Sequence, residues 1–339
     1  MGILELALFA SGFSKMFDIT PEDIALLNDT DLRHLIGRLC EEDLRKAGLS
    51  TACVSYGGNQ TAEDGGNDVR VELPPSACIN GYFRRRLTVF QSKAQYMPRA
   101  KILKEMCPKR VARPVLNELA SKSGSYIIAS SKGSTSETSL QNRRSAMRDA
   151  VKGVKGVRNL DLHFYDRTKL ATWVREHPGL VVWVRERIGR SFNGWRPYGA
   201  WASLAEDVSA EYLPDDKVRV QADRRDMAEG LSAEEGINQI RELLREQRNC
   251  VRLVGLSGVG KTRFVQALFD ERIGKNALVP ASAIYSNISD GPDPSPTGLL
   301  SDLIAQGRRA IIVIDNCPPD LHRSLSDLCR SQQSQLSLI

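Results

Sequence analysis

The chain has 339 residues, a length that favours two domains, because single domains usually run to about 100–200 residues. Its apolar content of 41% and charged content of 26% are typical of a folded globular protein and exclude an intrinsically disordered one. No apolar run approaches the ~20 residues that cross a bilayer, and the first residues lack the basic start of a signal peptide. We therefore expect a cytoplasmic protein with no membrane partner. Seven cysteines without a Cys-x-x-Cys pair indicate reduced thiols.

The net charge of +6 is modest, but the basic residues gather in two stretches. Between residues 84 and 113, ten Lys and Arg residues stand against one acid, Glu105. Between residues 141 and 158, six stand against Asp149. Such stretches suit a phosphate backbone, although they are also what a solvated basic surface looks like.

The hydrophobic pattern predicts one α/β domain over residues 1–190. Its expected elements, in chain order, are a helix over 30–47, strands over 68–73 and 87–93, a helix over much of 98–121, a strand over 126–130, a basic helix over 140–152, a strand over 160–165 and a helix over 169–177.

Residues 191–230 form a predicted connector, followed by a second domain over 231–339. The aromatic segment 192–201 either packs against a domain or stacks on nucleic-acid bases. The expected elements of the second domain are a helix opened by a capping box at Ser232 and Glu235, a buried strand over 251–254, a helix over 263–269 and a parallel-sheet strand over 310–314.

Residues 255–262, Gly-Leu-Ser-Gly-Val-Gly-Lys-Thr, fit the phosphate-binding pattern G-x-x-x-x-G-K-[ST] between a predicted strand and a predicted helix. We therefore predict a site for ATP with Mg²⁺. Lys261 is expected to reach the β- and γ-phosphates, and Thr262 and Asp315 to ligate the magnesium ion. Asn316 stands where many ATPases have a second acid, which favours slow ATP hydrolysis or binding alone. The other expected nucleotide contacts are Gly255, Ser257, Gly258, Val259 and Gly260.

This P-loop, with the later run from Ile311 to Asn316, resembles the STAND class of signalling ATPases over about 230–339. The resemblance implies a nucleotide switch that forms a homo-oligomer when a sensor region detects a trigger. Residues 336–339 are typical of the next core strand. We therefore expect only the N-terminal part of the NTPase domain here, with the sensor of an unknown trigger in a missing C-terminal region.

A second set of polar residues lies in the first domain. Alternation along a strand places Gln91 and Lys93 on one face, and Asp68 begins the neighbouring strand. A carboxylate and a lysine at adjoining strand ends suit metal-assisted phosphodiester cleavage. In that chemistry the acid holds magnesium, while the lysine orients water and offsets phosphate charge.

A further metal ligand is expected from the first helix. Asp43 lies beside the apolar stripe of that helix, where an acid is costly unless it has a partner. It is the first choice, and Glu42 and Glu41 are the alternatives.

Asp68 with Gln91-Ser-Lys93 resembles the Mrr-like branch of the PD-(D/E)XK nucleases, in its Gln-x-Lys form, over about 25–190. The resemblance implies a restriction-endonuclease-like mixed sheet flanked by helices, with Mg²⁺ as cofactor and double-stranded DNA as substrate. Joined to the STAND resemblance, it implies an endonuclease fused to an ATP-binding switch in bacterial antiphage defence. The alternative is a nucleotide-gated module that binds nucleic acid or protein through a catalytically silent nuclease-like domain.

Overall fold

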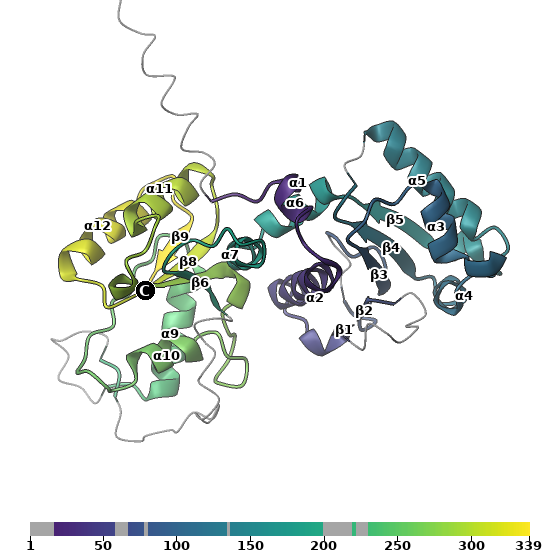
Figure 1. Ribbon diagram of the computed structural model, residues 1–339. Helices are drawn as coiled ribbons and strands as arrows, with labels where there is room; N and C mark the ends of the chain where they lie inside the picture. Colours follow the sequence, from purple (N-terminus) through teal and green to yellow (C-terminus); the bar gives the residue numbers. More distant parts are fainter. Residues whose placement is uncertain (1–16, 58–66, 78–80, 134–135, 199–218, 222–229) are drawn as a thin grey trace, which may run out of the picture. The chain divides into compact units, whose positions relative to one another are not determined.

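The computed structural model describes residues 17–57, 67–77, 81–133, 136–198, 219–221 and 230–339. The chain divides into two compact units, and both are α/β, as predicted (Figure 1). The first unit is made of Ile19–Leu180 with Arg187–Gly189. The second contains Val181–Glu186 and Arg190–Ile339. Phe17 also belongs to the second unit, because its ring stacks on Phe192 and its backbone N–H donates to Asp302 at 2.8 Å.

The first unit has a five-stranded mixed sheet in the order β1-β2-β3-β4-β5. Neighbours β1 to β3 pair antiparallel, and β3 to β5 pair parallel. The prediction of β3 is confirmed with the same limits, whereas β1 was not predicted. The strands are β1 (Val54–Tyr56), β2 (Val69–Glu72), β3 (Leu87–Lys93), β4 (Ser125–Ser130) and β5 (Asp161–Tyr165).

Helices cover both faces of this sheet. Helices α2 and α6 contact one face, while the other carries an apolar core shared by α3, α4 and α5 with alternate residues of β3 and β4. Leu87 and Val89 of β3 belong to that core, so Gln91 and Lys93 continue the same face. The helical elements are α1 (Pro21–Ile24), α2 (Asp29–Lys46), η1 (Thr51–Cys53), α3 (Arg99–Met106), η2 (Pro108–Arg110), α4 (Pro114–Ser121), α5 (Glu137–Ala150), η3 (Val157–Asn159), α6 (Arg167–Arg175) and α7 (Pro178–Arg187).

The prediction of a single helix over much of 98–121 is wrong in one respect, because this segment forms two helices. Helix α3 ends at Met106, and α4 begins at Pro114. Pro108 and Pro114 have no backbone N–H to donate, and each clashes with a preceding helical turn, so each can only begin a helix. The break turns the chain between two helices that pack on the same face of the sheet.

The second unit has a four-stranded sheet in the order β6-β7-β8-β9. Strands β7 to β9 are parallel, and the last confirms the strand expected at 336–339, with its end at Leu338. The connector contributes β6, antiparallel to β7, and Trp195 donates to the carbonyl of Pro294 at 2.7 Å, so this part of the aromatic segment packs against the unit. Trp201 lies outside the described residues. The elements are β6 (Trp195–Pro197), α9 (Ala233–Arg245), α10 (Lys261–Ala267), η4 (Pro280–Ser282), β7 (Ala283–Asn287), η5 (Ile288–Asp290), α11 (Pro296–Ala305), β8 (Ala310–Asp315), α12 (Pro319–Cys329) and β9 (Leu336–Leu338).

The buried strand predicted over 251–254 is not formed. Only Cys250 makes a β-bridge, to Leu338, and Val254 is 64% exposed. The backbone N–H of Val251 still donates to the carbonyl of Leu338 at 2.9 Å, but residues 252–254 are not part of a strand. Within the described residues, no helix combines the length and the apolar character needed to cross a membrane.

Candidate functional site

The P-loop connects the segment beside β9 to helix α10. Gly258 and Gly260 have φ angles of 82° and 87°, which strain any residue with a Cβ, so glycine is required at both. The ammonium group of Lys261 donates to the carbonyls of Gly255 and Leu256, at 3.0 and 2.8 Å. The lysine is therefore folded over the backbone of its own loop, close to where the pattern expects phosphate.

Asp315, the last residue of β8, meets the end of this loop. The hydroxyl of Thr262 donates to Oδ2 of Asp315 at 3.0 Å, and the hydroxyl of Tyr285 reaches the same oxygen at 3.3 Å. Asn287 is paired with Asp315 in the β7–β8 register and accepts from the side chain of Asn316 at 3.2 Å. Tyr285 and Asn287 were not predicted, because recognising them required the strand β7.

A pocket of 230 Å³ opens between the loop and β8. That is below the ~300–1,000 Å³ of a pocket enclosing a drug-sized ligand, and it suits the phosphate end of a nucleotide. His322 lies at this pocket, and burial, followed by the charge of Arg252, lowers the pKa of its imidazole. Hydroxyl and carboxylate oxygens are the ligands that Mg²⁺ prefers, so Thr262 and Asp315 fit a magnesium site.

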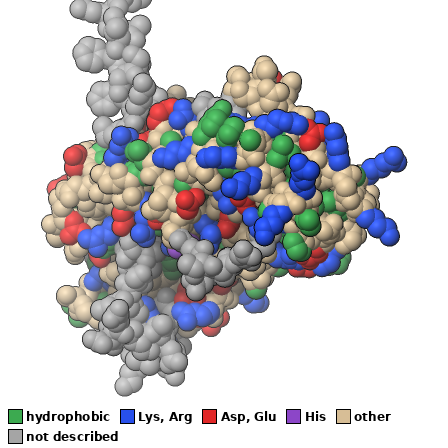
Figure 2. All heavy atoms as spheres, turned by 45° about the vertical axis from the view of Figure 1, so that its right-hand side comes forward, with side chains coloured by type: hydrophobic (Ala, Val, Ile, Leu, Met, Phe, Trp, Pro, Cys, Tyr) green, Lys and Arg blue, Asp and Glu red, His purple; other side chains and the backbone are tan. Residues whose placement is uncertain are grey.

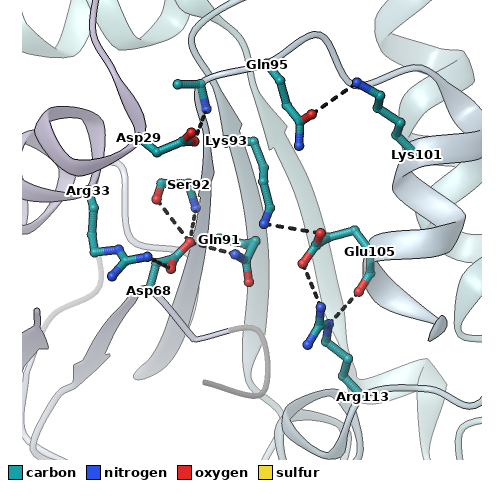
Figure 3. A network of polar contacts seen from close by, with 11 residues as sticks. Asp29, Arg33, Asp68, Gln91, Ser92, Lys93, Gln95, Lys101, Glu105 and Arg113 are labelled. Atoms are coloured by element: carbon teal, nitrogen blue, oxygen red, sulfur yellow. Dashed lines mark hydrogen bonds and ion pairs between the residues drawn. The ribbon is translucent and has the colours of Figure 1, made fainter. Parts of the chain in front are cut away.

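In the first unit, the carboxylate of Asp68 lies at the centre of a polar network (Figure 3). It is 6% exposed, directly before β2. Its Oδ2 accepts from the Gln91 amide at 2.6 Å and from the backbone N–H and hydroxyl of Ser92, at 2.8 and 3.0 Å. Its Oδ1 pairs with the guanidinium of Arg33 on α2, at 2.8 Å. Both oxygens are therefore engaged by groups of the chain itself.

Lys93 does not contact Asp68 directly. Its ammonium group pairs with Glu105 of α3 at 3.2 Å, and Glu105 also pairs with Arg113 at 3.0 Å. In Figure 3 the Gln91 amide lies between the Asp68 carboxylate and the Lys93 ammonium. Gln91 thus contacts Asp68 but Lys93 is held by Glu105, so the predicted meeting of acid and lysine is not a direct contact. The sequence showed Glu105 only as the single acid in a basic stretch.

The structure does not bring Asp43 to this network. The indole of Trp173 donates to one oxygen of Asp43 at 3.0 Å, and His177 lies 3.0 Å from the other. Asp43 is ten residues beyond Arg33 on the same helix, which separates them by ~15 Å along its axis. The cost of an acid beside the apolar stripe is offset by these two partners rather than by a metal.

The two alternative acids also have partners of their own. Glu42 pairs with Arg45 at 2.5 Å, and Glu41 shares a hydrogen bond with Tyr56 while burial raises its pKa. The acid of α2 that does reach the network is Asp29, which accepts from the backbone N–H of Ala94 at 2.7 Å. Its position four residues before Arg33, on the same helix face, was the signal available in the sequence.

A divalent cation fits the first unit only in part. Among the described residues, no three His, Cys, Asp or Glu side chains gather as metal ligands. However, Oε1 of Gln91 is buried without a hydrogen-bond partner among the described residues, and it lies beside the carboxylate of Asp68. Oδ1 of Asp68 already pairs with the guanidinium of Arg33. Asp68 and Gln91 could hold a divalent ion if Arg33 withdrew.

Comparisons with protein-family models, with curated proteins and with solved structures find no match to this chain.

Proposed function

We propose that this chain is a nucleotide-gated DNA endonuclease, with an ATP- and magnesium-binding switch in the second unit and a phosphodiester-cleaving site in the first. The observation that carries the proposal is that Lys261, Thr262 and Asp315 line one pocket, although 53 residues of chain separate Thr262 from Asp315. A cation, a hydroxyl and a carboxylate so placed match the needs of a triphosphate with its metal ion.

Within this pocket each residue has a distinct role. Phosphate oxygens would replace the loop carbonyls that now accept from Lys261. Thr262 and Asp315 would hold the magnesium ion, which when bound neutralises charge on the phosphates. Tyr285, through its hydrogen bond to Asp315, would keep that carboxylate oriented.

Calorimetric titration of the full chain with a non-hydrolysable ATP analogue and Mg²⁺ tests the switch. Lys261→Ala removes charge-assisted hydrogen bonds worth ~1.5–3 kcal/mol each, so affinity should fall by about tenfold or more. Lys275→Ala, an exposed lysine outside the pocket, is the matched control. Equal affinity of Lys261→Ala and wild type would refute the nucleotide site.

The nuclease part of the proposal is supported by Asp68, Gln91 and Lys93 on adjoining strands, the order that the PD-(D/E)XK resemblance implies. Asp68 orients the Gln91 amide, and the 19%-exposed Lys93 side chain can offset charge on a scissile phosphate. Magnesium, when bound, would supply charge stabilisation beside Asp68 and Gln91. The basic stretches would hold the DNA backbone without reading its sequence.

Nicking of supercoiled plasmid, measured with ATP and Mg²⁺ present, tests the cleavage site. Lys93→Ala is expected to abolish nicking while leaving ATP affinity unchanged. Lys122→Ala, an exposed lysine paired with Glu118 at the other end of the unit's parallel strands, should nick as wild type does. Nicking by Lys93→Ala at the wild-type rate would rule out the nuclease assignment.

One observation favours a second candidate, a nucleotide-gated module that binds nucleic acid without cutting it. Both oxygens of Asp68 are already engaged, one of them by Arg33. This candidate expects salt-sensitive DNA binding that needs neither Mg²⁺ nor Lys93. DNA binding and nicking measured with and without Mg²⁺ separate the two functions.

The resemblance to STAND ATPases extends the proposal to antiphage defence, with ATP-driven self-association as the gating step. Mass measurement by light scattering, with and without the ATP analogue, tests this extension. Wild type should form a larger species with the analogue, and Lys261→Ala should not. A mass that is independent of nucleotide in wild type would remove self-association from the proposal.

A further inference from the structure

Helix α5 carries a buried arginine for which the described residues provide no counter-ion. Arg143 is 4% exposed, and neither of its terminal nitrogens has a hydrogen-bond partner. The guanidinium lies 5.1 Å from the ring centroid of Tyr96 and 4.8 Å from that of Phe164. Ring faces offset part of the lost hydration, but they cannot accept the N–H groups in the plane of the guanidinium. A buried cation in this state is costly unless something else binds it.

The position of Arg143 in the fold points to a ligand. Tyr96 follows the end of β3 by three residues, Gly133 follows the end of β4 by three, and Phe164 is the penultimate residue of β5. Arg143 therefore lies beyond the carboxyl ends of all three parallel strands, where open α/β sheets bind their ligands. Lys93 ends β3 at this same edge, and its carbonyl accepts from the backbone N–H of Ser131 at 3.2 Å.

The loop after β4 passes close to the buried guanidinium of Arg143. A Cβ on Gly133 would stand 2.9 Å from one terminal nitrogen, so the loop passes the guanidinium only because residue 133 is glycine. In the same loop the hydroxyl of Ser131 is also buried without a partner. Tyr96, by contrast, is 54% exposed and covers one face of the guanidinium from the surface.

The positive charge on the side of the first unit that carries α3 and α5 favours a long polyanion as the ligand. Figure 2, which brings the side with α3 and α5 forward, shows Lys and Arg side chains spread over the surface. A planar guanidinium with two available N–H edges matches two oxygens of one phosphate group. An exposed tyrosine beside it can stack on a base.

We propose that Arg143 is a phosphate-binding residue that grips one backbone phosphate of DNA lying across the carboxyl ends of β3 and β4. The Tyr96 ring turns aside to admit the phosphate. This inference rests on the DNA partner of the proposed function, but it does not depend on cleavage. The contact with Arg143, in addition to that with Lys93, would fix the path of the DNA backbone over the protein.

The test is DNA binding as a function of salt, in EDTA so that no cleavage occurs. Anisotropy of a labelled 20-base-pair duplex is measured for wild type, Arg143→Met and Lys122→Met. Each phosphate contact contributes about 0.9 to the slope of log K against log salt concentration. Arg143→Met should lower the slope by about 1. Lys122→Met carries the same charge change at the opposite end of the parallel strands, on an exposed residue outside both basic stretches, and should not alter the slope.

Gly133→Ala provides a second variant that retains the arginine. Its added methyl displaces the guanidinium, so the salt slope should fall as in Arg143→Met. If both variants keep the wild-type slope and affinity, Arg143 is a structural contact and the inference fails. A second outcome also contradicts the inference. If millimolar inorganic phosphate raises the melting temperature of wild type but not of Arg143→Met, and the two proteins have the same salt slope for DNA binding, then the ligand of Arg143 is free phosphate. A wild-type chain that binds no DNA refutes the proposed function itself.

Discussion

Arg241 of α9 gives a sharp prediction about what holds the P-loop helix. Its side chain is fully buried, and its guanidinium is surrounded by carbonyl groups from the end of α10 and the turn that follows. The accepting oxygens are those of Ala267 at 2.7 Å, Leu268 at 2.9 Å, Asp270 at 2.8 Å, Ile273 at 2.6 Å and Lys275 at 2.9 Å. One arginine therefore gives a charged donor to five carbonyls at and beyond the end of the helix, three of which also accept a backbone N–H.

Arg241→Met retains most of the side-chain length and removes every donor. The bonds to Ala267 and Leu268 are buried, and without them each carbonyl keeps only a backbone partner, the N–H of Asp270 at 3.2 Å and that of Leu278 at 2.9 Å. At about 1–3 kcal/mol for each of the two buried hydrogen bonds removed, the loss is ~2–6 kcal/mol. The other three carbonyls lie in partly buried bonds and can be hydrated. Even the lower figure lowers hydrogen-exchange protection of α10 about 30-fold.

Hydrogen exchange of the full chain is the suitable assay, because two units need not unfold in one transition. Exchange should accelerate in peptides spanning 261–270 and stay unchanged in peptides spanning 125–130 of the first unit. The matched control is Arg245→Met, an exposed arginine one turn further along α9, which should change exchange little. Wild-type protection of 261–270 in Arg241→Met would refute the reasoning.

Three further predictions follow from single contacts. Gly37→Ala places a Cβ 2.4–2.5 Å from ring atoms of Tyr56, so we expect the first unit to lose about 1–3 kcal/mol in thermal unfolding, and an unchanged melting temperature would contradict the packing. Arg33→Gln removes the cation paired with Asp68, so Mn²⁺ titrated without nucleotide should bind at least about tenfold tighter, and equal affinity would show that Arg33 is no competitor. Burial and the charge of Arg252 lower the pKa of His322, so the imidazole is neutral at pH 7. A bound triphosphate favours the imidazolium. An NMR titration of His322 should therefore show a higher pKa with ATP than without it. A pKa that is insensitive to saturating ATP would place the phosphates elsewhere.

The sequence by itself determined those features whose causes are local. The P-loop pattern occupies eight consecutive residues, and two of its three glycines, Gly258 and Gly260, adopt the positive φ angles that only glycine takes easily. Strand β3 was predicted with its observed limits because Leu87–Phe90 are apolar or β-branched residues, which are typical of a strand. The alternation of side chains along a strand correctly placed Gln91 and Lys93 on one face of the sheet.

The tertiary structure alone decided which acid meets which partner. Helical periodicity shows that Asp43 lies beside the apolar stripe of its helix. It does not show which side chain of another segment packs against that part of the helix. Trp173 and His177 occupy that place for Asp43, from 130 residues and more along the chain, while Arg33 and Asp29 lie level with Asp68 and Ala94. Likewise, only the packing of α5 against three strand ends shows that Arg143 is a buried cation without a counter-ion among the described residues. Contacts of this kind depend on the distance between chain segments in space, and no local pattern encodes that distance.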